Sequence, residues 1–130
     1  MGQPAAKQGD KVVGLDTHVL MVPSPGGPVP MPTPMPFCGQ LDGELSGDVV
    51  IDERAAAVKG STASNAPAHV PAAGPFQKPP SNKGTVDAGS ATVLINGKPA
   101  ARCGDAALTC NDPGDAPNGT VMATSSVLVG

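Results

Sequence analysis

Residues 96–105 read NGKPAARCGD and follow the apolar run TVLI at residues 92–95. A β-branched run, a tight Asn-Gly turn and a small-residue segment ending in Gly-Asp predict a strand, a turn and a returning strand. Related segments stand at residues 4–10 (PAAKQGD) and 49–61 (VVIDERAAAVKGS). Residues 126–130 (SVLVG) repeat only the strand. The sequence therefore contains three related units.

Aligning the units places Asp10, Ser61 and Asp105 at equivalent positions. The first unit has no strand ahead of its small-residue segment, and the final strand, residues 127–129, has no such segment after it. We therefore expect the two ends of the chain to pair. A closed body of three units has approximate threefold symmetry and no free sheet edges. The prediction is an all-β fold: one domain, residues 1–130, forming a short conical body of β-hairpins closed by its N- and C-terminal segments.

The composition predicts a poor hydrophobic core. The 130 residues suit one small domain, but they include no Trp or Tyr, two Phe, 17 Gly and 16 Pro. Such a composition approaches that of disordered chains. The repeats favour a packed fold instead, and a small core of this kind is often stabilised by a metal ion.

Charge and cysteine usage exclude several classes of protein. The net charge is −3 without any run of Lys or Arg, so nucleic-acid binding is not expected. Three cysteines and no signal-like segment after Met1 argue against an exported disulfide scaffold. We expect synthesis in the cytoplasm, with thiols free to bind metal. No apolar stretch approaches the length of a membrane span.

Two proline-rich excursions interrupt the units. Residues 23–36 contain seven prolines, which predict an ordered surface insertion, extended like polyproline or irregular, and neither helix nor central strand. The second excursion covers residues 75–84. Both contain a Pro-Phe pair, ending at Phe37 and Phe76, and both return to a strand through Gly-x-apolar.

The repeat register brings metal-ligating residue types to equivalent loops. His18 lies eight residues after Asp10, His69 lies eight after Ser61, and Cys110 lies five after Asp105. Equivalent loops of a threefold body converge on its axis. Imidazole nitrogen and thiolate sulfur are ligands that suit tetrahedral Zn²⁺. The spacing therefore predicts one metal site formed by all three units.

A structural zinc site requires a fourth ligand. Cys38 is the candidate, because it stands at the return of the first excursion, where a loop could reach the axis. Cys103 is a weaker candidate, since its equivalents Gln8 and Lys59 indicate a position open to solvent. Water and Met35 are further alternatives.

The repeated segments resemble a known family. The PAAR tetrapeptide at residues 99–102, followed by Gly-Asp at residues 104–105, and the related residues 4–10 closely resemble PAAR repeat proteins. The stretches at residues 16–18, 76–84 and 109–113 are similar to the PAAR-like branch. The resemblance covers essentially the whole chain.

The resemblance implies a cone of β-hairpins with a structural zinc ion near its apex, commonly held by three histidines and one cysteine. This chain departs from that pattern, because it has only two histidines and carries Met35 before Pro36-Phe37, where relatives may have a histidine. The expected ligands are therefore His18, His69, Cys110 and Cys38.

The resemblance also implies a function. Such a cone caps the trimeric β-helical, VgrG-like spike of a contractile injection system, either a type VI secretion system or an extracellular phage-tail-like particle, and aids penetration of the target envelope. We expect one chain on one trimer, assembled at the tip of the particle, with effectors as further possible partners. The expected seat is the set of strands at residues 49–51, 93–95 and 127–129.

Two other functions remain as alternatives. A small zinc-dependent hydrolase could use Asp16 or Asp112 as a general base beside His18 or Cys110, but both aspartates are read as turn residues. No catalytic motif is present in the sequence, so an enzyme is not expected. A free-standing adhesin or effector carrier is the other alternative, although the three units leave no further domain.

Overall fold

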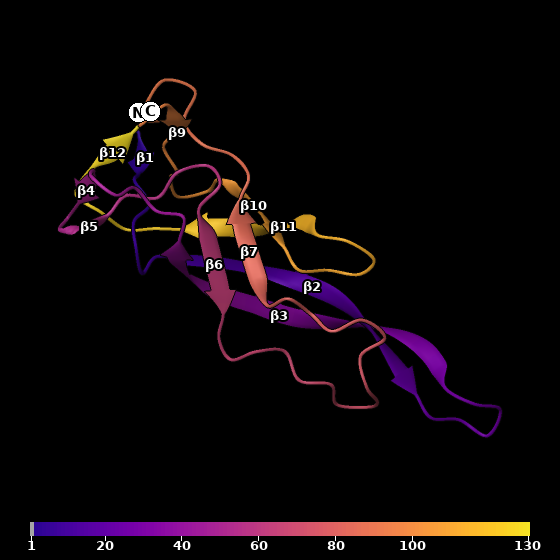
Figure 1. Cartoon of the computed structure of the whole chain (residues 1–130). Coiled ribbons are helices and arrows are strands. Elements are labelled where there is room, and N and C mark those ends of the chain that lie inside the picture. Colours follow the sequence, from indigo (N-terminus) through magenta and orange to yellow (C-terminus); the bar gives the residue numbers. More distant parts are fainter. Residues whose placement is uncertain (1) are drawn as a thin grey trace.

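Three small strand pairs and one closed barrel make up the structure, a computed structural model that describes residues 2–130. These residues are all-β (Figure 1), and none forms a helix long and apolar enough to cross a bilayer. The strands are, in chain order, β1 (Gln3–Pro4), β2 (Lys11–Val22), β3 (Val29–Gly43), β4 (Val50–Ile51), β5 (Arg54–Ala55), β6 (Thr62–Asn65), β7 (Lys83–Val86), β8 (Leu94–Ile95), β9 (Lys98–Pro99), β10 (Ala106–Thr109), β11 (Ala116–Met122) and β12 (Leu128–Val129).

The barrel contains one antiparallel hairpin from each unit. Its strand order is β10-β11-β2-β3-β6-β7, and the closing contact pairs β7 with β10. Closure leaves no free edge within the barrel. The three-unit organisation predicted from the repeats is thus present in the strand pairing.

The remaining strands form three equivalent pairs, β1–β12, β4–β5 and β8–β9, which we call the base. The strand β12 supplies the partner that the first unit lacks, because Gln3 pairs with Val129 and Pro4 with Leu128. The two ends of the chain therefore lie together, as Figure 1 shows. The predicted closure by the terminal segments is confirmed.

A ring of three backbone hydrogen bonds joins the units where base and barrel meet. Ala57 donates to the carbonyl of Ala6, Ala101 to that of Ala57, and Ala6 to that of Ala101, at 2.9–3.0 Å. All three alanines are fully buried. Larger side chains would not fit where three backbones approach so closely.

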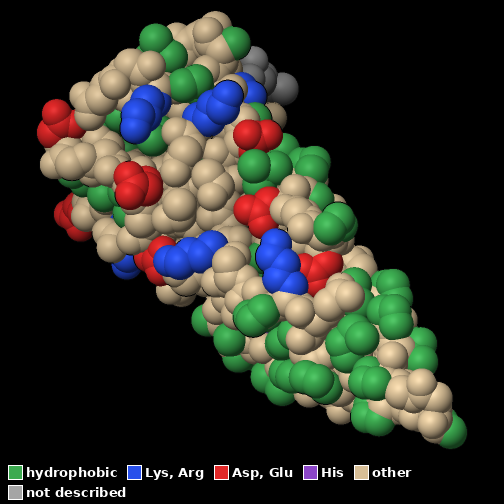
Figure 2. Space-filling model, turned by 45° about the vertical axis from the view of Figure 1, so that its right-hand side comes forward, with side chains coloured by type: hydrophobic (Ala, Val, Ile, Leu, Met, Phe, Trp, Pro, Cys, Tyr) green, Lys and Arg blue, Asp and Glu red, His purple; other side chains and the backbone are tan. Residues whose placement is uncertain are grey.

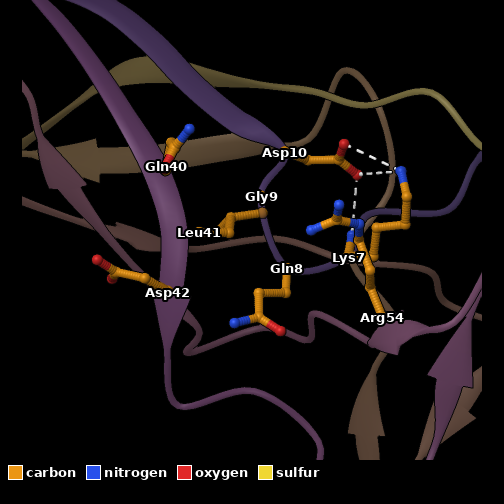
Figure 3. Close-up of a pocket in the computed structure, with 8 residues that line it drawn as sticks. All are labelled: Lys7, Gln8, Gly9, Asp10, Gln40, Leu41, Asp42 and Arg54. Atoms are coloured by element: carbon orange, nitrogen blue, oxygen red, sulfur yellow. Dashed lines mark hydrogen bonds and ion pairs between the residues drawn. The ribbon is translucent and has the colours of Figure 1, made fainter.

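The repeat register is also confirmed by side-chain contacts. Asp10, Ser61 and Asp105 each accept a hydrogen bond from the backbone N–H three residues earlier, at 3.0, 2.9 and 2.8 Å respectively. Figure 3 shows the first of these turns, where Lys7 also forms an ion pair with Asp10 at 3.1 Å. Two aspartates and one serine thus perform the same structural role.

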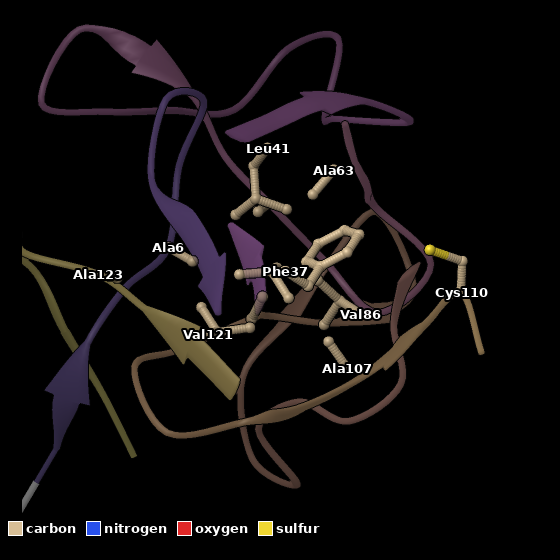
Figure 4. Packing of buried hydrophobic residues seen from close by; sticks show 12 residues of the cluster. Ala6, Phe37, Leu41, Ala63, Val86, Ala107, Cys110, Val121 and Ala123 are labelled. Carbon is tan, nitrogen blue, oxygen red and sulfur yellow. The ribbon is translucent and has the colours of Figure 1, made fainter. Parts of the chain in front are cut away.

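Phe37 fills the interior of the barrel and compensates for the shortage of large side chains (Figure 4). A Cβ atom added to Gly39 or Gly84 would lie 2.9 or 3.1 Å from its ring, so these two glycines make room for it. The apolar residues of the three Gly-x-apolar returns surround the ring from the three units: Leu41, Val86 and Val121.

The second half of the first proline-rich excursion is a paired strand, so the prediction of a polyproline-like or irregular surface loop is wrong for these residues. Residues 29–36 belong to β3 and pair with β2 from Val22↔Val29 to Leu15↔Pro36. The prolines stand at every second position, and proline is tolerated on an outer edge where its missing N–H would face away from the partner strand. The odd-numbered residues between them carry the backbone hydrogen bonds to β2. The excursion is ordered, as expected, but its second half is part of the strand β3 of the first barrel hairpin and not a surface loop.

The β2–β3 pair extends well beyond the barrel (Figure 1). We call its outer part the ribbon: residues 18–22, the turn, and residues 29–33. It gives the molecule a broad end at the base and a narrow end at the turn, as Figure 2 shows. The shape is conical, as predicted, but longer than the sequence indicated.

Enlarging one alanine of the ring should destabilise the whole fold. We expect Ala101→Leu to lower the free energy of unfolding by about 1–3 kcal/mol, because the added carbons must displace two neighbouring backbones. Chemical denaturation measures this change. The matched control is Ala106→Leu, at an exposed position on β10, which should alter stability by less than about 0.5 kcal/mol. Equal effects of the two substitutions would contradict the tight packing of the ring.

Candidate metal centre

Two polar side chains of the strand β2, Asp16 and His18, are buried at the end of the barrel. Burial alternates along this strand, with Asp16, His18 and Leu20 buried and their neighbours more exposed. Successive strand residues face opposite sides, so Asp16 and His18 lie on one face. Asp16 is therefore a buried strand residue, and its interpretation as a turn residue is wrong.

Four potential ligands from the three units converge at this point. Asp16, His18, His69 and Cys110 each offer one ligand atom, and these atoms all lie within 4.8 Å of one another. The Asp16 Oδ2 atom lies 3.0 Å from His69 Nε2 and 3.3 Å from Cys110 Sγ. Cys110 Sγ lies 3.6 Å from His18 Nε2. The group occupies one small volume and includes the three residues that the repeat register predicted, His18, His69 and Cys110, but not Cys38.

His69 reaches the group from the loop that follows β6. Its backbone N–H donates to Asn82 Oδ1 at 2.9 Å, and Asn82 also accepts from the Asn65 side chain at 3.2 Å. The rings of His18 and His69 lie 4.9 Å apart, and Phe76 packs edge-on against His18 at 5.9 Å. Two asparagine amides, of which Asn65 is buried, and an aromatic ring thus position the imidazoles.

Burial favours the neutral form of His18. Burial first, and then the neighbouring His69, lower the pKa of His18. Its Nδ1 atom has no hydrogen-bond partner, and the nearest carboxylate oxygen, Asp112 Oδ2, lies 3.7 Å away. A neutral imidazole leaves its Nε2 lone pair available to a metal ion. The carboxylate beside Nδ1 is typical of groups that orient metal-bound histidines.

Burial favours the protonated thiol of Cys110. Burial, followed by the charge of Asp16, raises its pKa to about 11. The thiol donates to Asp16 Oδ2, and the Thr109 hydroxyl donates to the other carboxylate oxygen. A metal ion would reverse this preference, because metal ligation requires the thiolate.

Asp16 is a buried carboxylate without a Lys or Arg beside it among the described residues. Its side chain is fully buried, and within residues 2–130 its ion-pair contacts are with His18 and His69 rather than with any Lys or Arg. A buried carboxylate costs free energy unless a positive charge or hydrogen bonds compensate it. A cation at the centre of the group would supply that charge. The donor set and its burial therefore fit a metal ion.

The other predicted ligands lie elsewhere. Cys38 is on β3 between the inward-facing Met35, Phe37 and Leu41, so the strand alternation places it on the outer face. It is half-buried and lines a surface pocket together with His69. Cys103 is half-buried and packs against the barrel core. Neither belongs to the group of four.

Two depressions adjoin the group, and the one lined by His69, Cys38 and Met35 has a volume of about 330 Å³. The depression beside His18 and Cys110 has a volume of about 60 Å³. A larger depression of about 450 Å³ lies next to Gly9 and Arg54, on the part of the molecule shown in Figure 3. None of the four grouped residues lines this third depression.

The group lies where the barrel narrows, and the ribbon continues beyond it. His18 pairs with Thr33, and the two strands remain paired as far as Val22 and Val29. The sequence predicted a metal at the apex; the ligand group lies beneath the projecting ribbon.

Comparison with known proteins agrees with the repeated segments. Residues 77–130 match the PAAR motif family. No curated protein and no solved structure matches this chain. With three equivalent units and a closed barrel, the match supports a PAAR-like spike-tip protein of contractile injection or type VI systems. The PAAR family is structural rather than enzymatic.

Thiol chemistry should distinguish Cys110 from the other cysteines in metal-free protein. At pH 8 a thiol with a pKa near 11 is only about 0.1% thiolate, and thiolate is the reactive form. We expect a maleimide reagent to modify Cys38 and Cys103 first, and Cys110 only as the pH approaches 11 or the protein unfolds. Peptide mass spectrometry after timed quenching measures the order. Early modification of Cys110 at pH 8 would contradict its burial.

Proposed function

We propose that this protein is a zinc-stabilised tip that caps a trimeric, VgrG-like spike and helps it penetrate the target envelope. The observation that carries the proposal is the buried Asp16 carboxylate, which faces two imidazoles and a thiol without a Lys or Arg partner. We assign His18, His69 and Cys110 as ligands, with Asp16 as the fourth.

Charge balance supports this ligand set. One thiolate, one carboxylate and two neutral imidazoles carry two negative charges, which Zn²⁺ neutralises. A neutral centre is the form that burial favours. Nitrogen, sulfur and carboxylate oxygen are all ordinary zinc ligands, and four protein ligands are typical of structural rather than catalytic sites.

Asp16 is preferred to Cys38 as the fourth ligand because of strand geometry. Asp16 shares the inward face of β2 with His18, whereas Cys38 shares the outer face of β3 with Pro36 and Gln40. Moving the Cys38 side chain inward would require a change of register in β3, which would also turn Phe37 outward. Cys38 therefore remains the alternative that experiment must test.

The base provides a surface with the symmetry of a trimer. Val50, Leu94 and Leu128 occupy equivalent strands and expose 62%, 61% and 63% of their surface. A single chain with three such positions can present the same apolar contact to each of three identical partner chains. We propose that the base binds the spike and that the ribbon points away from it.

The ion would act mechanically. The barrel core contains one large aromatic side chain and many alanines, so apolar burial alone gives limited resistance to distortion. A structural zinc site in a small domain contributes on the order of 10 kcal/mol to folding. Bonds from β2 and from the loops after β6 and β10 to one ion would prevent the three units from separating under load.

The closed surroundings support this role over hydrolysis. A catalytic zinc site keeps one position for water or substrate, and a general base must reach that position. Here the carboxylate beside the two histidines lies within the ligand group, and of the four residues only His69 borders the larger adjoining depression, of about 330 Å³.

Metal analysis tests the ligand set. We expect the purified chain to bind about one zinc ion. His69→Ala, Cys110→Ser and Asp16→Asn should each lose most of it, because each removes one bond from a four-coordinate site. Heating with a strong chelator should unfold the wild-type chain at a markedly lower temperature. Elemental analysis and thermal denaturation measure both effects.

The matched control for this experiment is Cys38→Ser, which removes a thiol from the same barrel end. It should retain zinc as well as the wild type. Loss of zinc in Cys38→Ser together with retention in Asp16→Asn would replace Asp16 by Cys38 as the fourth ligand. Retention in Cys110→Ser would overturn the site.

Binding to the spike tests the proposed seat. We expect Leu94→Asp to weaken co-purification with the cognate trimeric spike at least about tenfold, because a charge would be buried against an apolar contact. Val70→Asp, at an exposed position outside the base, is the control and should bind normally. Equal binding of the two variants would contradict attachment through the base.

A further inference from the structure

The ribbon belongs to the longest uncharged part of the chain. The protein has 8 Lys and Arg and 11 Asp and Glu, yet none of them lies between Asp16 and Asp42. His18, the one titratable imidazole in this interval, is buried. The ribbon itself therefore carries no charged side chain. Two charged residues lie beside its β2 edge: Asp112, whose carboxylate accepts from the Val19 N–H, and the exposed Lys78, which follows the Gln77 that donates to the Val19 carbonyl.

Exposed apolar side chains gather on the same part. Val29 and Met31 on the ribbon expose 50% and 41% of their surface, and Leu15 at its foot exposes 58%. Figure 2 shows the narrow end covered by hydrophobic side chains, while the acidic and basic side chains in view lie over the wider part. In water such a surface has an unfavourable hydration free energy.

The ribbon also exposes few backbone donors. On the outer edge of β3, the positions that would point an N–H outward are occupied by proline, which has none: Pro30, Pro32, Pro34 and Pro36. The carbonyls of these prolines still point outward, so this edge presents acceptors without donors. On the outer edge of β2, the amides of Thr17, Val19 and Met21 donate to the loops that contain Asn111, Asp112 and Pro75. Unsatisfied backbone groups are the main obstacle to placing a strand in hydrocarbon.

The same prolines exclude the commonest protein partner for a free strand. Addition of a strand requires N–H donors along the edge of β3, and alternate positions supply none. A charged peptide or an acidic surface has nothing on the ribbon to pair with. The surface of the ribbon therefore fits contact with a neutral apolar medium.

We propose that the ribbon inserts into the hydrocarbon region of a lipid bilayer and requires no anionic lipid to do so. This inference rests on the proposed tip function, which directs the ribbon toward the target envelope, and it names the material that the ribbon enters. The four-residue step from His18 to Val22 rises about 14 Å, and the turn adds to it. Because the hydrocarbon core is about 30 Å thick, the ribbon reaches into one leaflet rather than across both.

A tryptophan reporter provides the test, since the chain contains no other Trp. The probe is the full chain carrying Met31→Trp, mixed with vesicles of phosphatidylcholine. We expect its emission to shift to shorter wavelength as lipid is added, because the indole leaves water. The shift should be the same at low and high salt, since no charge contributes to it.

Charge substitutions identify the surface responsible. Val29→Asp, added to the reporter chain, should weaken partitioning into the vesicles about tenfold or more. The control is Met122→Asp, which places the same charge at an equally exposed position on the barrel and should leave the shift unchanged. Circular dichroism of both variants verifies that they are folded.

Three results would overturn the proposal: no shift with phosphatidylcholine, an equal shift in the Val29→Asp and Met122→Asp chains, or a shift seen only with anionic vesicles and abolished by salt. Co-purification with the spike is measured on the same chains. Loss of lipid binding with intact spike binding rejects the insertion alone, whereas loss of spike binding in the unaltered chain rejects the proposed tip function.

Discussion

The structure depends on the ring of hydrogen bonds among Ala6, Ala57 and Ala101. These bonds hold three segments, far apart in the sequence, at a distance that only small side chains allow. Once the ring is formed, the turns that follow it start the three barrel hairpins at equivalent positions. The repeated segment therefore has a direct physical cause: the ring requires alanine, and the turn requires a side-chain oxygen four residues after that alanine.

The three units are alike at the base, and they differ from one another at the narrow end. At the base the three units present nearly identical apolar positions, whereas beyond the barrel they diverge. The first unit extends into the ribbon, the second contributes His69 through a loop, and the third contributes Cys110 directly after β10. A symmetric surface suits a trimeric partner, and an asymmetric end permits four different side chains to meet in one small volume.

Much of this arrangement could be predicted from the sequence, because repeated residue types identify equivalent positions. The closure of the ends and the convergence of His18, His69 and Cys110 follow from that register. Asp16 was missed as a ligand because Asp-Thr is common in turns. Its spacing of two residues from His18 does place both side chains on one face if the segment is a strand. The ribbon was missed because proline usually interrupts strands. Only its alternation with non-proline residues, at Pro30, Pro32 and Pro34, distinguishes an outer strand from a loop.

The pairing of β1 with β12 also determines when the fold can be completed. Gln3 and Pro4 emerge early from the ribosome, but their partners Leu128 and Val129 are made only after the second and third units. Until Ala101 is made the ring lacks its third member, and until Leu128 and Val129 are made the first unit has an unpaired strand. Folding of the whole body is therefore delayed until translation of this region is finished, and a truncated nascent chain cannot form a closed tip.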